Sequence, residues 1–169
     1  FDSAQGEAQG RISSVRLDKG EERVLGLGQG RLLSFSGQGE LAVMVDPRRD
    51  LPSLDAFRGT LALTPDVSTA PRTTLPNVVY ADISSTGEKA VVRYLEGRFR
   101  LECPIGDVRI DHGTFLWATR FSPDGRYLAF WESPDWQSTR IGLLALQSGK
   151  TRVLAEGSTF HGLAWRNGG

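Results

Sequence analysis

Short apolar runs with alternating polar positions dominate the chain, and stretches with the 3.6-residue period of an amphipathic helix are nearly absent. Clear examples are residues 41–45, 91–95, 127–131 and 141–146, which are rich in β-branched, aromatic and leucine side chains. Glycine, together with serine, aspartate or proline, separates these runs and indicates tight turns. Only residues 50–57 could hold a helical turn, and a proline within them disfavours it. The pattern therefore predicts an all-β chain.

One segment is repeated: a strand, a serine, a turn that ends in glycine, and a second apolar strand. The glycines that end these turns are Gly39, Gly87, Gly125 and Gly168. They recur at intervals of roughly 40 to 50 residues, which is the period of a four-stranded propeller blade. Glycine supplies the positive φ of a hairpin turn, and in the third copy we expect Ser122 and Asp124 to hydrogen-bond the turn backbone.

Each copy can be read as a meander of four strands. The prediction is therefore an all-β fold, a β-propeller of four-stranded antiparallel blades that forms one segment over residues 1–169 and does not complete a ring. About three full blades are expected, with part of a blade before them and the start of another after them. These segments are about 31–75, 78–111 and 115–155 for the blades, 11–25 for the earlier part, and 160–169 for the later one.

The third turn, residues 122–125 with the sequence Ser-Pro-Asp-Gly, resembles the WD-like SPDG repeat of the TolB translocation protein and of prolyl-oligopeptidase propellers. Residues 101–106, this turn and residues 162–165 follow one another in the chain. Their order most closely resembles the propeller that follows the kinase domain in some bacterial serine/threonine kinases, and this resemblance covers much of residues 31–165. The first two copies depart from the motif, with Ser-Gly-Gln-Gly and Ser-Ser-Thr-Gly in its place. The resemblance implies a sensor or interaction domain beside a catalytic domain.

No catalytic motif accompanies the repeat. The Gly-x-Ser-x-Gly nucleophile elbow and the His-Arg-Asp and Asp-Phe-Gly kinase signatures do not occur. Residues 26–30, Gly-Leu-Gly-Gln-Gly, resemble a phosphate loop superficially, but Arg31 stands where the third glycine belongs, so we interpret them as a turn. The single cysteine, Cys103, lies in an apolar strand-like segment, where we expect a small buried side chain rather than a nucleophile. We expect a non-catalytic chain.

The candidate binding residues are few. The two histidines, His112 and His161, have no cysteine cluster near them, and we expect neither a metal nor a cofactor. Trp136 lies in a polar loop between two strands of the third blade, and His161 begins an inner strand that could face the central channel. We take Trp136 and His161 as the candidate contacts to a partner. Trp117 and Trp165 are expected to pack between blades.

Charge is balanced, with 20 Lys and Arg against 20 Asp and Glu among 169 residues. This balance is not typical of nucleic-acid binding or of polybasic membrane-surface modules, and no apolar run is long enough to insert into a membrane. A protein partner or an unidentified ligand is therefore expected. An incomplete ring also leaves strand edges open, so two copies of an excised or natural fragment could complete each other. Residues 162–165 of one copy would then pair with residues 11–25 of the other, or of the same chain.

The favoured hypothesis is a non-catalytic sensor or protein-interaction propeller from a bacterial serine/threonine kinase. Two alternatives follow from the same resemblance: the gating propeller of a prolyl-oligopeptidase-like peptidase, and a TolB-like periplasmic interaction protein. The kinase resemblance favours a location outside the cytoplasm, although one cysteine and a neutral charge are also compatible with the cytoplasm.

Overall fold

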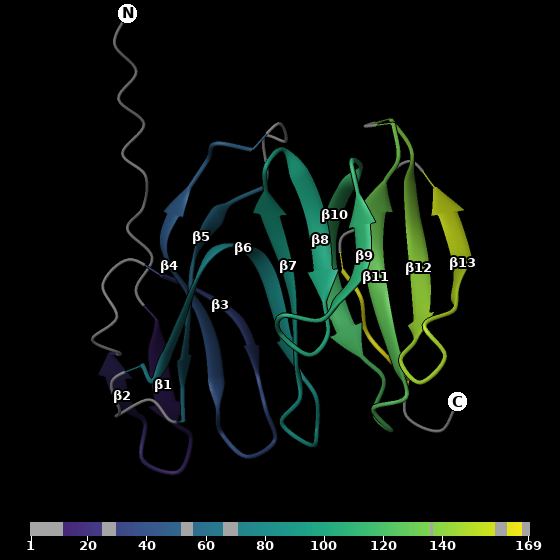
Figure 1. The fold of residues 1–169 in the computed structure, drawn as a ribbon. Helices are drawn as coiled ribbons and strands as arrows, with labels where there is room; N and C mark the ends of the chain where they lie inside the picture. Colours follow the sequence, from purple (N-terminus) through teal and green to yellow (C-terminus); the bar gives the residue numbers. More distant parts are fainter. Residues whose placement is uncertain are drawn as a thin grey trace, which may run out of the picture.

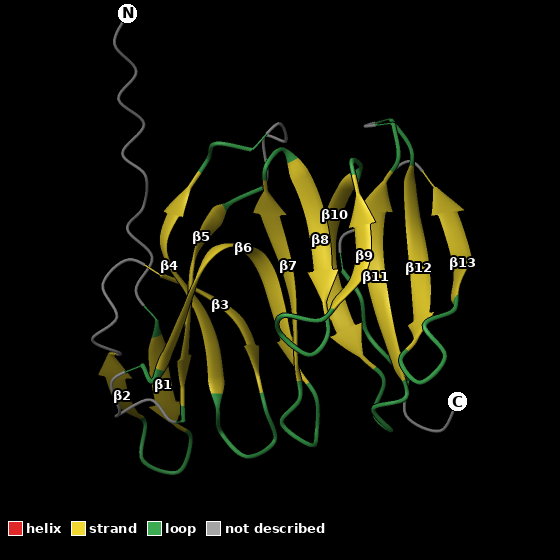
Figure 2. Cartoon of the chain, viewed as in Figure 1, coloured by secondary structure: helices red, strands yellow, loops and turns green. Residues whose placement is uncertain are grey.

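The structure is a computed structural model. It describes residues 12–24, 30–51, 56–65, 71–135, 137–157 and 162–166. Every regular element within these ranges is a β-strand, and none of them is a helix (Figure 2). The same ranges contain no helix long and apolar enough to cross a membrane. The predicted all-β fold is confirmed.

The strands of the described ranges form three antiparallel sheets, in each of which neighbours in the chain are neighbours in the sheet (Figure 1). The two-stranded sheet consists of β1 (Ser13–Arg16) and β2 (Glu21–Val24). The seven-stranded sheet consists of β3 (Gly30–Phe35), β4 (Leu41–Arg48), β5 (Arg58–Thr64), β6 (Thr73–Ile83), β7 (Lys89–Leu95), β8 (Arg98–Glu102) and β9 (Val108–His112). The four-stranded sheet consists of β10 (Phe115–Phe121), β11 (Tyr127–Ser133), β12 (Thr139–Ala145) and β13 (Thr151–Gly157).

The seven-stranded sheet is two blades that share strand β6. Residues 73–75 of this strand pair with β5, residues 80–83 pair with β7, and Val78 pairs with both. The ladder with β5 is irregular at Pro76 and Asn77, where proline has no N–H for the ladder and asparagine takes a φ of 63°. The blades expected at 31–75 and 78–111 therefore meet inside one continuous strand, because the proline bends the strand without ending it.

Three blades can be followed in Figure 1: β3 to the first part of β6, the rest of β6 to β9, and β10 to β13. The inner strands β3, β6 and β10 lie next to one another, whereas the β1–β2 hairpin and the third blade lie at opposite ends of the arc. Residues 162–166 run beside β10, where the Trp165 indole Nε1 donates a hydrogen bond to the Arg120 carbonyl at 3.1 Å. The described strands do not close a ring.

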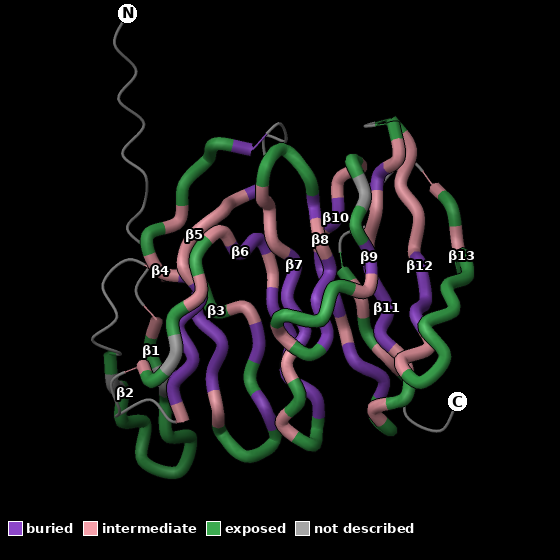
Figure 3. Tube along the Cα trace, in the orientation of Figure 1, coloured by how far each residue is buried: buried purple, intermediate pink, exposed green. Residues whose placement is uncertain are grey.

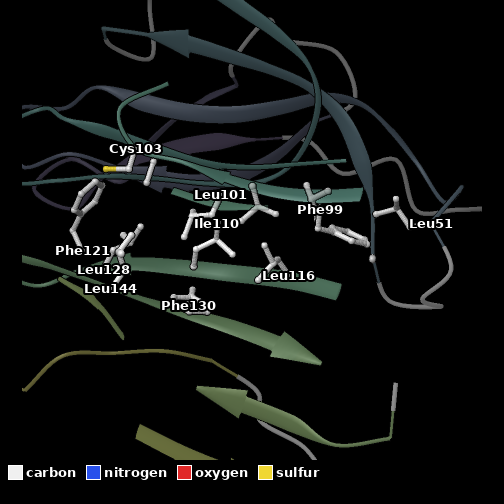
Figure 4. Packing of buried hydrophobic residues seen from close by; sticks show 14 residues of the cluster. Leu51, Phe99, Leu101, Cys103, Ile110, Leu116, Phe121, Leu128, Phe130 and Leu144 are labelled. Atoms are coloured by element: carbon white, nitrogen blue, oxygen red, sulfur yellow. The ribbon is translucent and has the colours of Figure 1, made fainter. Parts of the chain in front are cut away.

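Apolar side chains between successive blades form the core, and exposure increases outward to β13 (Figure 3). Between the second and third blades, Leu101, Ile110 and Leu116 gather with Phe99 and other buried side chains (Figure 4). Trp117 packs against this cluster. A second cluster, between the first and second blades, includes Leu61, Leu63, Ile83 and Val91.

The residue that directly precedes each turn serine shows how the blades cover one another. On β6 and β10 these residues are Ile83 and Phe121, and each is 6% exposed. The equivalent residue on β3 is Phe35, which is 68% exposed. Phe35 is more exposed than Ile83 and Phe121 because none of the described strands lies against β3 as a further inner strand on that side. The first blade therefore keeps an uncovered apolar edge.

Candidate functional site

Both residues predicted to contact a partner, Trp136 and His161, lie outside the described residues. The turn glycine of the fourth copy, Gly168, also lies outside them. These three assignments stay predictions. The turns of the first three copies are described, and so are the inner strands that carry them.

The three turns are built alike and have a structural role. φ is +90°, +88° and +68° at Gly39, Gly87 and Gly125. In the third turn, the Ser122 hydroxyl accepts a hydrogen bond from the Tyr127 N–H at 2.9 Å and donates one to Asp124 Oδ1 at 2.6 Å. Hydrogen bonds from this hydroxyl and from Arg126 lower the pKa of Asp124 to about 2. Asp124 is therefore an ionised carboxylate that holds the turn.

A buried polar network joins the three inner strands. Asp82 on β6 is 3% exposed. Its Oδ1 accepts hydrogen bonds from the Ser34 hydroxyl on β3 at 2.7 Å and from the Arg120 guanidinium on β10 at 3.0 Å. Its Oδ2 accepts a hydrogen bond from the Phe121 N–H at 2.7 Å. Because both oxygens have donors, the buried carboxylate connects neighbouring blades through hydrogen bonds.

The network was not predicted from the sequence, although the repeat contains a signal for it. Ser34, Asp82 and Arg120 all stand two residues before a turn serine, and all three are polar. A polar residue at the same place in three apolar strands indicates a shared hydrogen-bonding position.

Two further buried groups also have structural roles. Glu102 is 2% exposed, pairs with the Arg93 guanidinium at 3.2 Å and accepts the Gly106 N–H at 2.9 Å. Cys103 is fully buried, as predicted. Burial, and then the nearby Glu88 carboxylate, raise the pKa of the Cys103 thiol to about 12. This thiol is therefore protonated near neutral pH, and a protonated thiol is not a nucleophile.

The burial of Cys103 leads to a labelling prediction. At pH 8 a disulfide reagent is expected to modify the folded protein far more slowly than the protein unfolded in guanidinium, because the thiol is covered and protonated. The folded pKa lies above the ordinary value of 9.0, so this group adds stability below about pH 9 and loses it as the pH rises toward 12. Cys103→Ala should reduce the fall in melting temperature above pH 9. Equal labelling rates in the two states would contradict the prediction.

Arginine side chains gather at the end of the first blade that lies opposite the repeat turns. The guanidinium carbon of Arg31, on β3, lies 4.3 Å from the ring centroid of Phe57, and that of Arg49, just after β4, lies 4.7 Å from it. We call these three residues the arginine cluster. Burial lowers the pKa of Arg31, and the positive charge of Arg49 lowers it further, while Tyr80 opposes the shift. The cluster was not predicted from the sequence.

A pocket of about 140 Å³ is lined in part by Arg48 and Arg58, the chain neighbours of Arg49 and Phe57 in the arginine cluster. The register of β4 and β5 shifts between Val45 and Arg48, and this irregularity lies at the pocket. Asp46 and Asn77 in its wall have φ values of 50° and 63°, left-handed conformations that are uncommon for residues other than glycine. The lining residues are Asp46, Arg48, Arg58, Gly59, Thr60, Pro76 and Asn77.

Among the described residues, no group of three or more His, Cys, Asp or Glu side chains is placed to hold a metal ion. The ionisable groups that the fold buries take part in hydrogen bonds and ion pairs between strands. The ionisable groups of the arginine cluster and of the pocket lie at the surface. The surface at this end of the first blade is the candidate site that the described residues provide.

The sheets and their repeated turns are those of a β-propeller. Neither protein-family models nor curated proteins match the chain. Among solved structures, it is similar to the β-propeller domain of the Trilobed protease from Pyrococcus furiosus, described as having an open velcro topology, with a TM-score of 0.51 and 15% sequence identity. The match covers 75% of this chain and 42% of that structure, so the chain spans less than half of its length. At this identity the likeness establishes the fold.

Proposed function

We propose that the chain is a non-catalytic β-propeller segment that binds a protein partner through the loop end of its blades. The observation that carries the proposal is the separation of two kinds of charged group. Asp82 and Glu102 are buried and bonded between strands, whereas Arg31 and Arg49 are exposed at a loop end. A rigid scaffold with exposed polar loops is the usual arrangement of a binding propeller.

We further propose that the segment belongs to a bacterial serine/threonine kinase and acts as its sensor or interaction domain. This proposal is supported by the order of the SPDG turn with residues 101–106 and 162–165. A second candidate is the gating propeller of a prolyl-oligopeptidase-like peptidase. It is favoured by the likeness to the propeller domain of a protease.

The coding sequence on either side of this chain distinguishes the two candidates. A kinase domain with His-Arg-Asp and Asp-Phe-Gly motifs upstream would support the first, and a Gly-x-Ser-x-Gly hydrolase domain would support the second. The purified chain should neither hydrolyse ATP nor cleave peptides above the buffer rate. Turnover that persists through purification and disappears on unfolding would overturn the non-catalytic assignment.

We also propose that a second copy of the chain covers the uncovered edge of the first blade. On that side Phe35 is 68% exposed, and Val15 and Val24 of the β1–β2 hairpin are 56% and 52% exposed. At the other end of the arc, residues 162–166 lie beside the inner strand β10, and Ala164 is exposed. An inner strand at one end and outer strands at the other are complementary parts of one blade.

Phe35→Ser tests this association. The change removes an exposed ring, so it should leave the melting temperature of the single chain nearly unchanged while shifting light scattering from the mass of two copies to that of one. Val108→Ser is the matched control, because Val108 is 47% exposed on β9 in the second blade, away from this edge, and should leave the mass unchanged. A wild-type chain with the mass of one copy at all concentrations would exclude the second copy.

A further inference from the structure

Two arginines from different parts of the first blade share one aromatic ring. Arg31 comes from the start of β3 and Arg49 from the residues after β4, and both guanidinium carbons lie within 5 Å of the Phe57 ring centroid, at 4.3 and 4.7 Å. The ring attracts each cation. The same arrangement also brings two positive charges together, and their mutual repulsion opposes it. A pair of cations held in this way is a preformed site for negative charge.

Neither member of the pair has an ion-pair partner among the carboxylates that the structure describes. Arg31 and Arg49 are both exposed residues, although Arg31 is partly covered, so a ligand can reach them. Of the other arginines, Arg58 pairs with Asp50, Arg93 with Glu102, and Arg98 with Asp111. Arg48, which lines the pocket with Arg58, has no ion-pair partner among the described carboxylates. The arginine cluster is therefore a local excess of positive charge on a chain whose overall charge is zero.

We propose that Arg31 and Arg49 bind acidic side chains of an extended peptide segment from a protein partner. Guanidinium groups bind carboxylates through paired N–H donors, and Phe57 fixes the position of both groups before the ligand arrives. This inference rests on the proposed partner binding and adds the chemistry of the partner.

The neighbouring pocket supports a peptide rather than a free anion. Its wall contains Arg48 and Arg58, but also Asp46, and Arg58 is paired with Asp50. Because these positive and negative charges balance, the pocket itself does not favour an anion. A volume of about 140 Å³ is instead suited to one uncharged side chain next to the acidic residues. A nucleic acid is disfavoured because the 20 Lys and Arg of the chain are balanced by 20 Asp and Glu.

The test is fluorescence anisotropy with a labelled peptide that contains two adjacent glutamates followed by leucine, flanked by glycine and serine. The whole chain should bind this peptide at low salt, with affinity falling as salt is added. A peptide with glutamines in place of the glutamates should bind at least about tenfold more weakly. Arg31→Gln and Arg49→Gln should each weaken binding by about tenfold, and Phe57→Leu should weaken it as well.

Arg152→Gln is the matched control, because Arg152 is exposed on β13, in the third blade, and should leave binding unchanged. The melting temperatures of all variants show whether they are folded. If the peptide binds wild type and both arginine variants equally, the assigned site is wrong while partner binding stands. If inorganic phosphate competes at concentrations similar to those of the peptide, the peptide preference is wrong. Absence of glutamate-peptide binding at millimolar concentration would overturn the inference without bearing on the activity assays described above.

Discussion

Asp82→Ala is expected to lower the free energy of unfolding by about 3–5 kcal/mol. The substitution leaves the Ser34 hydroxyl, the Arg120 guanidinium and the Phe121 N–H without the carboxylate that accepts their hydrogen bonds. The Ser34 hydroxyl and the Phe121 N–H are buried, so water does not replace the acceptor that they lose. The partly exposed Arg120 guanidinium loses its counter-ion. Urea unfolding followed by tryptophan fluorescence measures the change.

A matched control is available in the hairpin. Asp18 is exposed and pairs with Arg16 at 3.0 Å, so Asp18→Ala should cost less than about 1 kcal/mol. Ser34→Ala should give an intermediate loss, because it removes one of the donors to Asp82 and leaves the ion pair with Arg120. If Asp82→Ala and Asp18→Ala were equally mild, Asp82 would not connect the blades in solution.

Leu101→Ala is expected to cost about 2–5 kcal/mol, through the apolar surface that is lost and the cavity that is left. Leu101 is 0% exposed and lies in the cluster between the second and third blades (Figure 4). Leu17→Ala is the control, since Leu17 is 96% exposed, and it should change stability by no more than about 0.5 kcal/mol. Similar losses for the two leucines would mean that the second and third blades do not pack as described.

The all-β fold could be predicted because its determinants are local. Alternation of apolar and polar residues sets the strands, and the glycine in each turn is required by a positive φ, which is +68° at Gly125. These constraints act within a few residues and can be read from one repeat. The continuity of β6 could not be predicted in the same way, because Pro76 is compatible both with a break between strands and with a bend inside one.

The candidate site depends on contacts between distant parts of the chain. Asp82 meets partners 48 and 39 residues away, and no local pattern brings them together. The arginine cluster needs the ends of β3, β4 and β5 to converge on Phe57, which follows only from the pairing of these strands. The sequence places Trp136 in a polar loop and His161 at the start of an inner strand, and the contacts expected of them stay predictions.

Because β6 runs through two blades without a loop, the first and second blades belong to one sheet and are joined through its ladder. The third blade is joined differently, through the two residues between β9 and β10, the hydrogen bonds of Asp82 and the apolar cluster that contains Leu101. The first two blades are therefore held together by backbone pairing in one sheet, whereas the third is held to them by side-chain contacts and a short connection.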